Sequence, residues 1–158
     1  MIGTARGAAL RGFALGVAVM AGATTACAQD WTEPARGSQL RRDLLDALRP
    51  IAEWNLGAPV EFYVSTLRVR GDHAFGMVLA QRPGGGAIDM AQTPVVKRGE
   101  FDPELAEVGA GMEAFWIKSG AMWSVVDYGI GSTDVWFQSE PFCAEFGPLI
   151  PEYCRGLR

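Results

Sequence analysis

The one histidine of the chain, His73, stands next to Asp72, and an imidazole beside a carboxylate can carry out general acid–base chemistry. The pair follows Gly71 between two apolar runs, which is typical of a hairpin turn, and a histidine beside a turn is usually solvated. A single histidine excludes a zinc site built from several imidazoles, and the cysteines alone do not complete one. We therefore expect no catalytic residue, no metal site and no cofactor.

Two further groups of residues suggest sites but lack the spacing that the chemistry requires. The glycines at 84–86 are not followed by the Lys-Ser/Thr pair of a phosphate-binding loop, so we expect a flexible loop. The acids between residues 100 and 107 lack the alternating pattern and central glycine of a calcium loop. We expect them in the first turn of a short helix, where the helix dipole favours negative charge.

The N-terminal residues predict export. Residues 1–11 are basic, residues 12–23 are apolar without a charge, and small residues follow, which is the order of a secretory signal peptide. The apolar run is shorter than the roughly 20 residues of a membrane-spanning helix. The stretch Ala26-Cys27-Ala28 predicts cleavage before Gln29, so that no transmembrane segment is left. A lipoprotein anchored at Cys27 stays open as the alternative to a periplasmic or secreted protein.

Cleavage before Gln29 discards Cys27, and lipidation blocks its thiol. In both cases Cys143 and Cys154 are the two cysteines that can form a disulfide. A pair of cysteines in an exported chain predicts a disulfide bond, and the short intervening stretch contains glycine and proline, which favour a closed loop. Two unpaired, partly buried thiols are the alternative.

The size and charge of the remaining chain limit its class. Removing the signal peptide 1–28 leaves 130 of 158 residues, which suffices for an irregular arm over 29–37 and a single domain over 38–158. The leader contains two of the 14 basic residues, so 12 basic residues stand against 18 acidic ones. Nucleic acids and anionic membranes require clustered positive charge, so we expect neither as a partner.

A long amphipathic helix is predicted over residues 39–56. Ser38 can cap its start, Gly57 can end it, and Pro50 is expected to kink it or to begin a new turn. Apolar residues recur with a period of 3.6 at Leu40, Leu44, Ala47, Leu48 and Ile51.

Residues 60–81 predict a β-hairpin that turns at Gly71-Asp72, with a bulge near Ser65-Thr66 where the apolar phase slips by one. The rest of the chain predicts a loop over 83–94, a short helix over 102–109, strands over 112–118, 122–129 and 133–137, and an irregular tail. We therefore predict an α+β fold, with one long N-terminal helix packed on a curved antiparallel sheet of four to five strands.

This order of elements resembles the cystatin-like and nuclear-transport-factor-2-like group of small α+β proteins, in which a curved sheet wraps a helix. The likeness extends over about residues 38–137 and is carried by the helix 39–56, the hairpin around 69–75 and the late strands 115–120 and 122–126. Residues 120–126 are similar to the group's Gly-x-Trp-x-hydrophobic-hydrophobic strand, with one extra residue. The resemblance implies one alternative function: an enzyme with Asp127 or Glu113 in a concave apolar pocket.

A second resemblance involves the turn between the late strands. Residues 119–123, Ser-Gly-Ala-Met-Trp, are similar to the Ser-Gly-x-x-Tyr loop of periplasmic lysozyme inhibitors, with Trp in place of Tyr. This likeness implies a second alternative, an inhibitor of a cell-wall hydrolase, and it requires that the loop protrude.

Large aromatic residues gather in the C-terminal strands. Side chains alternate along a strand, so Phe115 and Trp116 lie on opposite faces, as do Trp136 and Phe137. One face packs on the helix, and the other requires a cover: the C-terminal tail, a partner such as a second copy in a homodimer, or a ligand. We predict a binding domain rather than an enzyme, for an unknown protein or a small apolar ligand, with the binding residues Trp116, Trp123, Tyr128 and Trp136.

Overall fold

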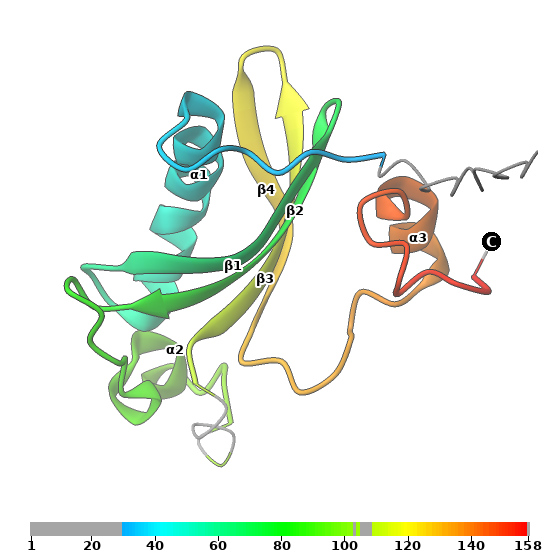
Figure 1. Ribbon diagram of the computed structural model, residues 1–158. Helices are drawn as coiled ribbons and strands as arrows, with labels where there is room; N and C mark the ends of the chain where they lie inside the picture. Colours follow the sequence, from blue (N-terminus) through cyan, green and yellow to red (C-terminus); the bar gives the residue numbers. More distant parts are fainter. Residues whose placement is uncertain (1–29, 103, 105–108, 158) are drawn as a thin grey trace, which may run out of the picture.

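The computed structural model describes residues 30–102, 104 and 109–157. The predicted signal peptide, Cys27 and most of the predicted helix over 102–109 lie outside the described residues. Within them, the fold is α+β, with three helices and one antiparallel sheet of four strands (Figure 1). In chain order the elements are α1 Gln39–Leu56, β1 Glu61–Arg70, β2 His73–Gln81, α2 Pro94–Lys97, β3 Gly111–Ser119, β4 Met122–Ile130 and α3 Glu140–Phe146.

Helix α1 confirms the predicted bounds and caps. The Ser38 side chain accepts a hydrogen bond from the Arg41 amide, and Gly57 ends the helix with a φ of 81°. Of the two possibilities expected at Pro50, a kink or a new turn, the new turn does not occur, because α1 runs on through this residue. Pro50 is exposed, so water can reach the carbonyl group that its missing N–H leaves unpaired, while the buried residues on the opposite side hold both halves together.

The sheet is a meander in the order β1-β2-β3-β4. The predicted hairpin over 60–81 is confirmed, and so is the bulge, since the register of β1 against β2 shifts between Val64 and Thr66. Strands β3 and β4 form the second predicted hairpin. A second shift lies between Phe115 and Trp116, where the pairs Phe115–Asp127 and Trp116–Val125 leave Val126 of β4 unopposed.

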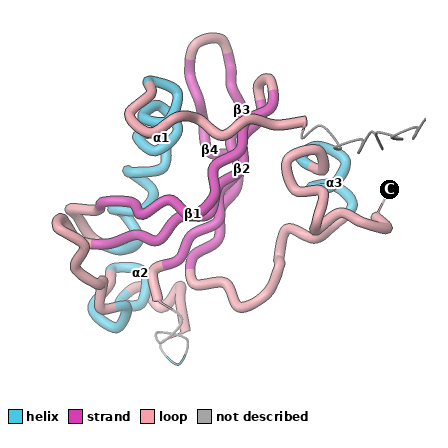
Figure 2. Tube along the Cα trace, in the orientation of Figure 1, coloured by secondary structure: helices cyan, strands magenta, loops and turns pink. Residues whose placement is uncertain are grey.

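Three predicted segments differ from the structure. No strand forms at 133–137; the segment is a loop that leads to α3 (Figure 2) and buries Phe137 against the sheet. The predicted loop over 83–94 contains a 3-10 turn, Met90–Gln92, and runs into α2. The tail forms α3, with a proline in its first turn, where the missing N–H has no helical partner to lose.

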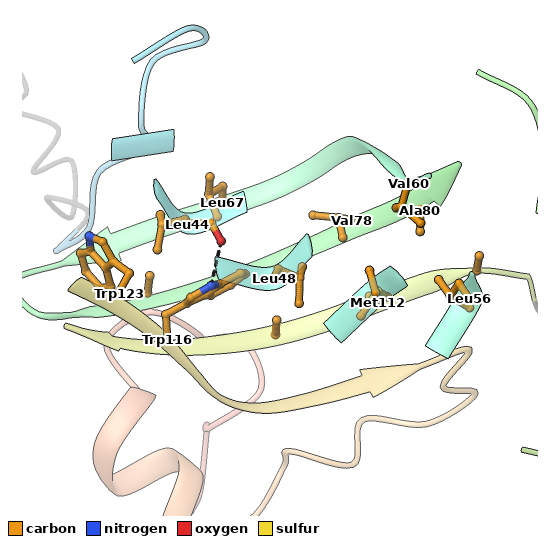
Figure 3. Packing of buried hydrophobic residues seen from close by; sticks show 14 of the residues in the cluster. Leu44, Leu48, Leu56, Val60, Leu67, Val78, Ala80, Met112, Trp116 and Trp123 are labelled. Carbon is orange, nitrogen blue, oxygen red and sulfur yellow. Dashed lines mark hydrogen bonds between the residues drawn. The ribbon is translucent and has the colours of Figure 1, made fainter. Parts of the chain in front are cut away.

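Helix α1 and the C-terminal segment lie on opposite sides of the sheet (Figure 1). Between α1 and the sheet lies a cluster that we call the inner core. Its centre is Trp116, whose indole N–H donates a 3.0 Å hydrogen bond to the Leu44 carbonyl oxygen (Figure 3). Around this bond pack Leu48, Leu56, Val60, Leu67, Val78, Ala80, Met112 and Trp123.

The opposite face of the sheet carries a second cluster, the outer core. Phe75 of β2 and Phe115 of β3 are fully buried there, beneath Phe137, Phe146, Leu149 and Ile150 from the C-terminal segment. Of the covers that the sequence left open, the chain's own C-terminal segment therefore supplies one. The predicted disulfide is confirmed, because the sulfur atoms of Cys143 and Cys154 lie 2.03 Å apart and tie α3 to the residues that follow it.

None of the helices among the described residues combines the length and the apolar character that crossing a membrane demands.

Candidate functional site

The structure does not bring the four predicted aromatic binding residues together on one face. Trp116 has no exposed surface and Trp123 is only 8% exposed, since both lie in the inner core. Tyr128 is 39% exposed, and its hydroxyl lies 3.3 Å from the Asn55 amide nitrogen of α1. Trp136 packs on the outer core instead. Tyr128 and Trp136 thus retain surface for contacts, whereas Trp116 retains none.

One hollow in the described part of the chain lies between β4 and α3, and we call it the α3 groove. Its volume is about 200 Å³. It is lined by Ile117 of β3, Val126 and Asp127 of β4, and Pro141, Phe142, Glu145 and Phe146 of α3. The groove thus lies at the margin of the aromatic face that the sequence pointed to.

The floor and one wall of the α3 groove are positioned by the outer core. Phe142 and Phe146 stand one helical turn apart on α3 and pack on Phe115, with ring centroids 4.9 and 4.8 Å away. Ile117 packs against the same cluster from β3. The opposite wall belongs to β4, where Val126 is the unopposed residue of the bulge and is 49% exposed. The apolar residues of the groove are therefore held in place by packing on the outer core.

Each wall of the α3 groove also contributes one carboxylate. Asp127 belongs to β4, and its side chain accepts a 2.8 Å hydrogen bond from the Tyr128 amide. Glu145 belongs to α3, and its carboxylate lies 3.5 Å from the His73 imidazole nitrogen. No Lys or Arg in the described part of the chain forms an ion pair with either acid. The groove thus combines an apolar floor with two carboxylates that lack a permanent cation.

His73 is placed differently from the sequence-based pairing with Asp72. Its ion-pair partner is Glu145, and its ring lies edge-on to Phe146 with centroids 5.3 Å apart. The Asp72 carbonyl oxygen accepts a hydrogen bond from the Lys118 amide, which links the two hairpins. His73 therefore belongs to the surroundings of α3 rather than to a His-Asp pair.

The α3 groove opens beside the edge of the sheet. In the order β1-β2-β3-β4, no described strand pairs with the far side of β4. The N–H and C=O groups on that side therefore have no strand partner among the described residues, as is usual at a sheet edge. Met122 and Val126 add exposed apolar side chains to the same strand.

The residues of the two alternative functions can also be located. Glu113 accepts a 3.4 Å hydrogen bond from the Trp136 indole N–H, and Asp127 lines the α3 groove. The space between α1 and the sheet is filled by the inner core. In the turn of the inhibitor hypothesis, Ser119 to Met122 are exposed while Trp123 is buried. The enzyme and the inhibitor alternatives both stay predictions.

A more open hollow of about 510 Å³ lies beside the end of α1. Trp54 is 69% exposed there, and the Arg98 guanidinium stacks on its ring with 5.0 Å to the centroid. Arg98 also donates hydrogen bonds to the Asn55 side chain and to Glu100. The pKa of Glu100 is lowered, first because these hydrogen bonds stabilise the carboxylate. This network pairs the charged groups of Arg98 and Glu100 with each other.

Sequence reasoning missed α3 and with it the α3 groove. The signals were present: Ser139 and Glu140 precede Pro141, and Phe142 and Phe146 follow at a spacing of four, which is a helix start with an apolar stripe. The prediction of an irregular tail is therefore wrong over Glu140–Phe146, where α3 forms.

The comparisons with known proteins supply no relative from which to infer this site. Neither family models, nor curated proteins, nor solved structures give a significant match to the chain. The resemblance to the cystatin-like and nuclear-transport-factor-2-like group stays a prediction, and the α3 groove is interpreted from its own geometry.

Proposed function

We propose that the protein is an extracytoplasmic, non-catalytic binding domain. It holds an extended segment of a partner protein along the free edge of β4, with one side chain of that segment inserted into the α3 groove. The observation that carries this proposal is the position of the groove, which opens beside an unpaired strand edge.

An edge strand and an adjacent hollow are the two parts that strand addition requires. The added strand gains affinity from main-chain hydrogen bonds, and pockets that receive alternate side chains give specificity. Val126 and Asp127 belong both to the free edge and to the groove, so an added strand and its side chain would be held by the same part of β4.

The size of the α3 groove favours a side chain over a free small molecule. Pockets for small ligands usually measure about 300–1,000 Å³, whereas this groove measures about 200 Å³. Of the two ligands that the sequence left open, a protein segment therefore fits this groove better. The extracytoplasmic location is supported by the Cys143–Cys154 disulfide, since such bonds persist in oxidising compartments, and by the predicted signal peptide.

The experiment is a selection of displayed random peptides on the immobilised full chain, followed by mapping of the selected peptides by NMR. We expect shifts in the backbone amides of β4 and α3. Val126→Trp should fill the mouth of the groove and abolish binding. Val135→Trp is the matched control, because Val135 is 37% exposed and Val126 is 49% exposed, but only Val126 lines the groove.

Circular dichroism of both variants establishes that they fold. Equal binding by wild type and Val126→Trp, or shifts confined to α1 and α2, would overturn the proposal.

A further inference from the structure

The charge of the α3 groove identifies the side chain that it receives. Resting on the proposed function, we infer that this side chain is an arginine or a lysine, so that the partner segment is a basic peptide. The inference rests on two carboxylates, Asp127 and Glu145, which stand on opposite walls of an apolar hollow.

Asp127 and Glu145 form no ion pair with an arginine or lysine of the described chain, unlike five acids elsewhere on the surface. Those five are paired with arginines: Asp30, Glu33, Asp46, Glu100 and Glu152. Asp127 has only a backbone N–H, and Glu145 has only His73, whose ring is charged only when protonated. A cation placed between the two walls would therefore meet carboxylates that no arginine or lysine of the described chain already neutralises.

The apolar lining fits the rest of an arginine or lysine side chain. These residues bury their aliphatic stem on apolar surface while the charged end stays near water or acids. Ile117 and Val126 can receive the stem, and a cation near the Phe142 ring gains a further attraction from the π-face. A volume of about 200 Å³ accommodates one long side chain rather than a folded ligand.

Other occupants fit less well. An acidic side chain would meet Asp127 and Glu145 as like charges. A purely apolar side chain would remove water from both carboxylates without replacing its hydrogen bonds. A second copy would meet a general electrostatic repulsion, because the chain has a formal net charge of −4.

The test uses a series of soluble peptides with one extended scaffold of alternating valine and threonine. Only the central residue varies: arginine, lysine, norleucine, glutamine or glutamate. Norleucine keeps an apolar stem like that of lysine and lacks the charge. We expect arginine and lysine peptides to bind at least about tenfold more tightly than the norleucine peptide at low salt, with the gap narrowing as salt rises.

The matched variants separate charge from shape. Asp127→Asn combined with Glu145→Gln should remove the preference for arginine and lysine while leaving the norleucine affinity unchanged. Glu53→Gln combined with Glu61→Gln removes two acids outside the groove and should leave the preference intact.

The outcomes distinguish this inference from the proposed function. Equal binding of charged and neutral peptides at β4 would overturn the inference and leave strand addition in place. Failure of every peptide to bind would overturn both. A dimer in sedimentation experiments that Val126→Trp dissociates would identify a second copy as the occupant and overturn the basic-peptide inference.

Discussion

The indole nitrogen of Trp116 donates a 3.0 Å hydrogen bond to the carbonyl oxygen of Leu44, which joins the centre of β3 to the middle of α1. Both side chains are fully buried, so this polar contact lies inside the apolar inner core. The residue that the sequence suggested as a binding aromatic is thus the point where helix and sheet are fixed to each other.

Trp116→Phe removes this donor and leaves a small void in the inner core. We expect the free energy of unfolding to fall by about 1–3 kcal/mol, measured by urea denaturation. Trp54→Phe is the control: its ring is exposed, so a change within about 0.5 kcal/mol is expected. Similar losses in both variants would contradict the assigned role of Trp116.

Gly76 of β2 lies close against Leu67 and Trp116 of the inner core. A Cβ atom at this position would lie 3.0 Å from a methyl group of Leu67 and 3.1 Å from the ring of Trp116. Gly76→Ala should therefore overpack the core and cost about 1–3 kcal/mol. At Gly111 a Cβ atom would meet nothing within 4 Å, so Gly111→Ala should be neutral or slightly stabilising. Both variants are measured by thermal unfolding.

Arg82 closes the C-terminal end of α1. Its guanidinium donates hydrogen bonds to the carbonyl oxygen of Leu56, which has no partner within the helix, and to those of Gly57 and Pro59 just after it. Arg82→Ala should lower the free energy of unfolding by about 2 kcal/mol. Arg82→Lys should recover only part of it, because one ammonium group cannot reproduce the planar fork. The rate of hydrogen exchange at the last turn of α1 should rise in both variants, and it should rise more in Arg82→Ala than in Arg82→Lys.

The disulfide holds the wall of the α3 groove. Replacing Cys143 and Cys154 by serine frees a loop with a sequence separation of 11 and should cost about 3 kcal/mol. Hydrogen exchange should increase first over 140–157, and affinity for a groove-binding peptide should fall while the inner core stays protected. Uniform loss of protection across the molecule would instead show that the disulfide stabilises the whole fold.

The Arg98–Glu100 pair predicts a pH response. The Glu100 pKa lies below its ordinary value, chiefly because Arg98 donates hydrogen bonds of 2.9 and 2.7 Å to the carboxylate. A depressed carboxyl pKa adds stability above the unfolded-state pKa, and this is lost as pH falls through the lower folded-state value. NMR titration should show the Glu100 pKa rising toward its ordinary value in Arg98→Gln and staying low in Arg36→Gln.

The elements that local patterns define could be predicted from the sequence. The apolar stripe between Ser38 and Gly57 places α1, and the turn at Gly71-Asp72 places the first hairpin. The segment 133–137 has the composition of a strand, but Phe137 gains more by burial in the outer core than β4 offers by pairing. The composition of residues 133–137 does not reveal that burial of Phe137 competes with strand pairing.

The candidate site was less accessible to prediction. Alternation correctly separates Phe115 from Trp116, yet it does not say which face the tail covers. The α3 groove combines residues of β3, β4 and α3, which meet only through tertiary packing. Ile117 and Glu145 are 28 positions apart in sequence, so no local spacing could indicate their proximity.

The outer core has a consequence for the order in which the molecule is completed. Within the described chain, most of the cover of Phe75 and Phe115 comes from Trp136 and the residues after it, so a chain that ends with β4 would have its helix and whole sheet but a largely bare aromatic face. During synthesis or transport, this face stays open until the last segment arrives, and exposed apolar surface of that kind promotes aggregation. Premature termination near residue 130 would thus yield a nearly complete meander that is prone to self-association, and a chaperone would have to shield it until α3 docks.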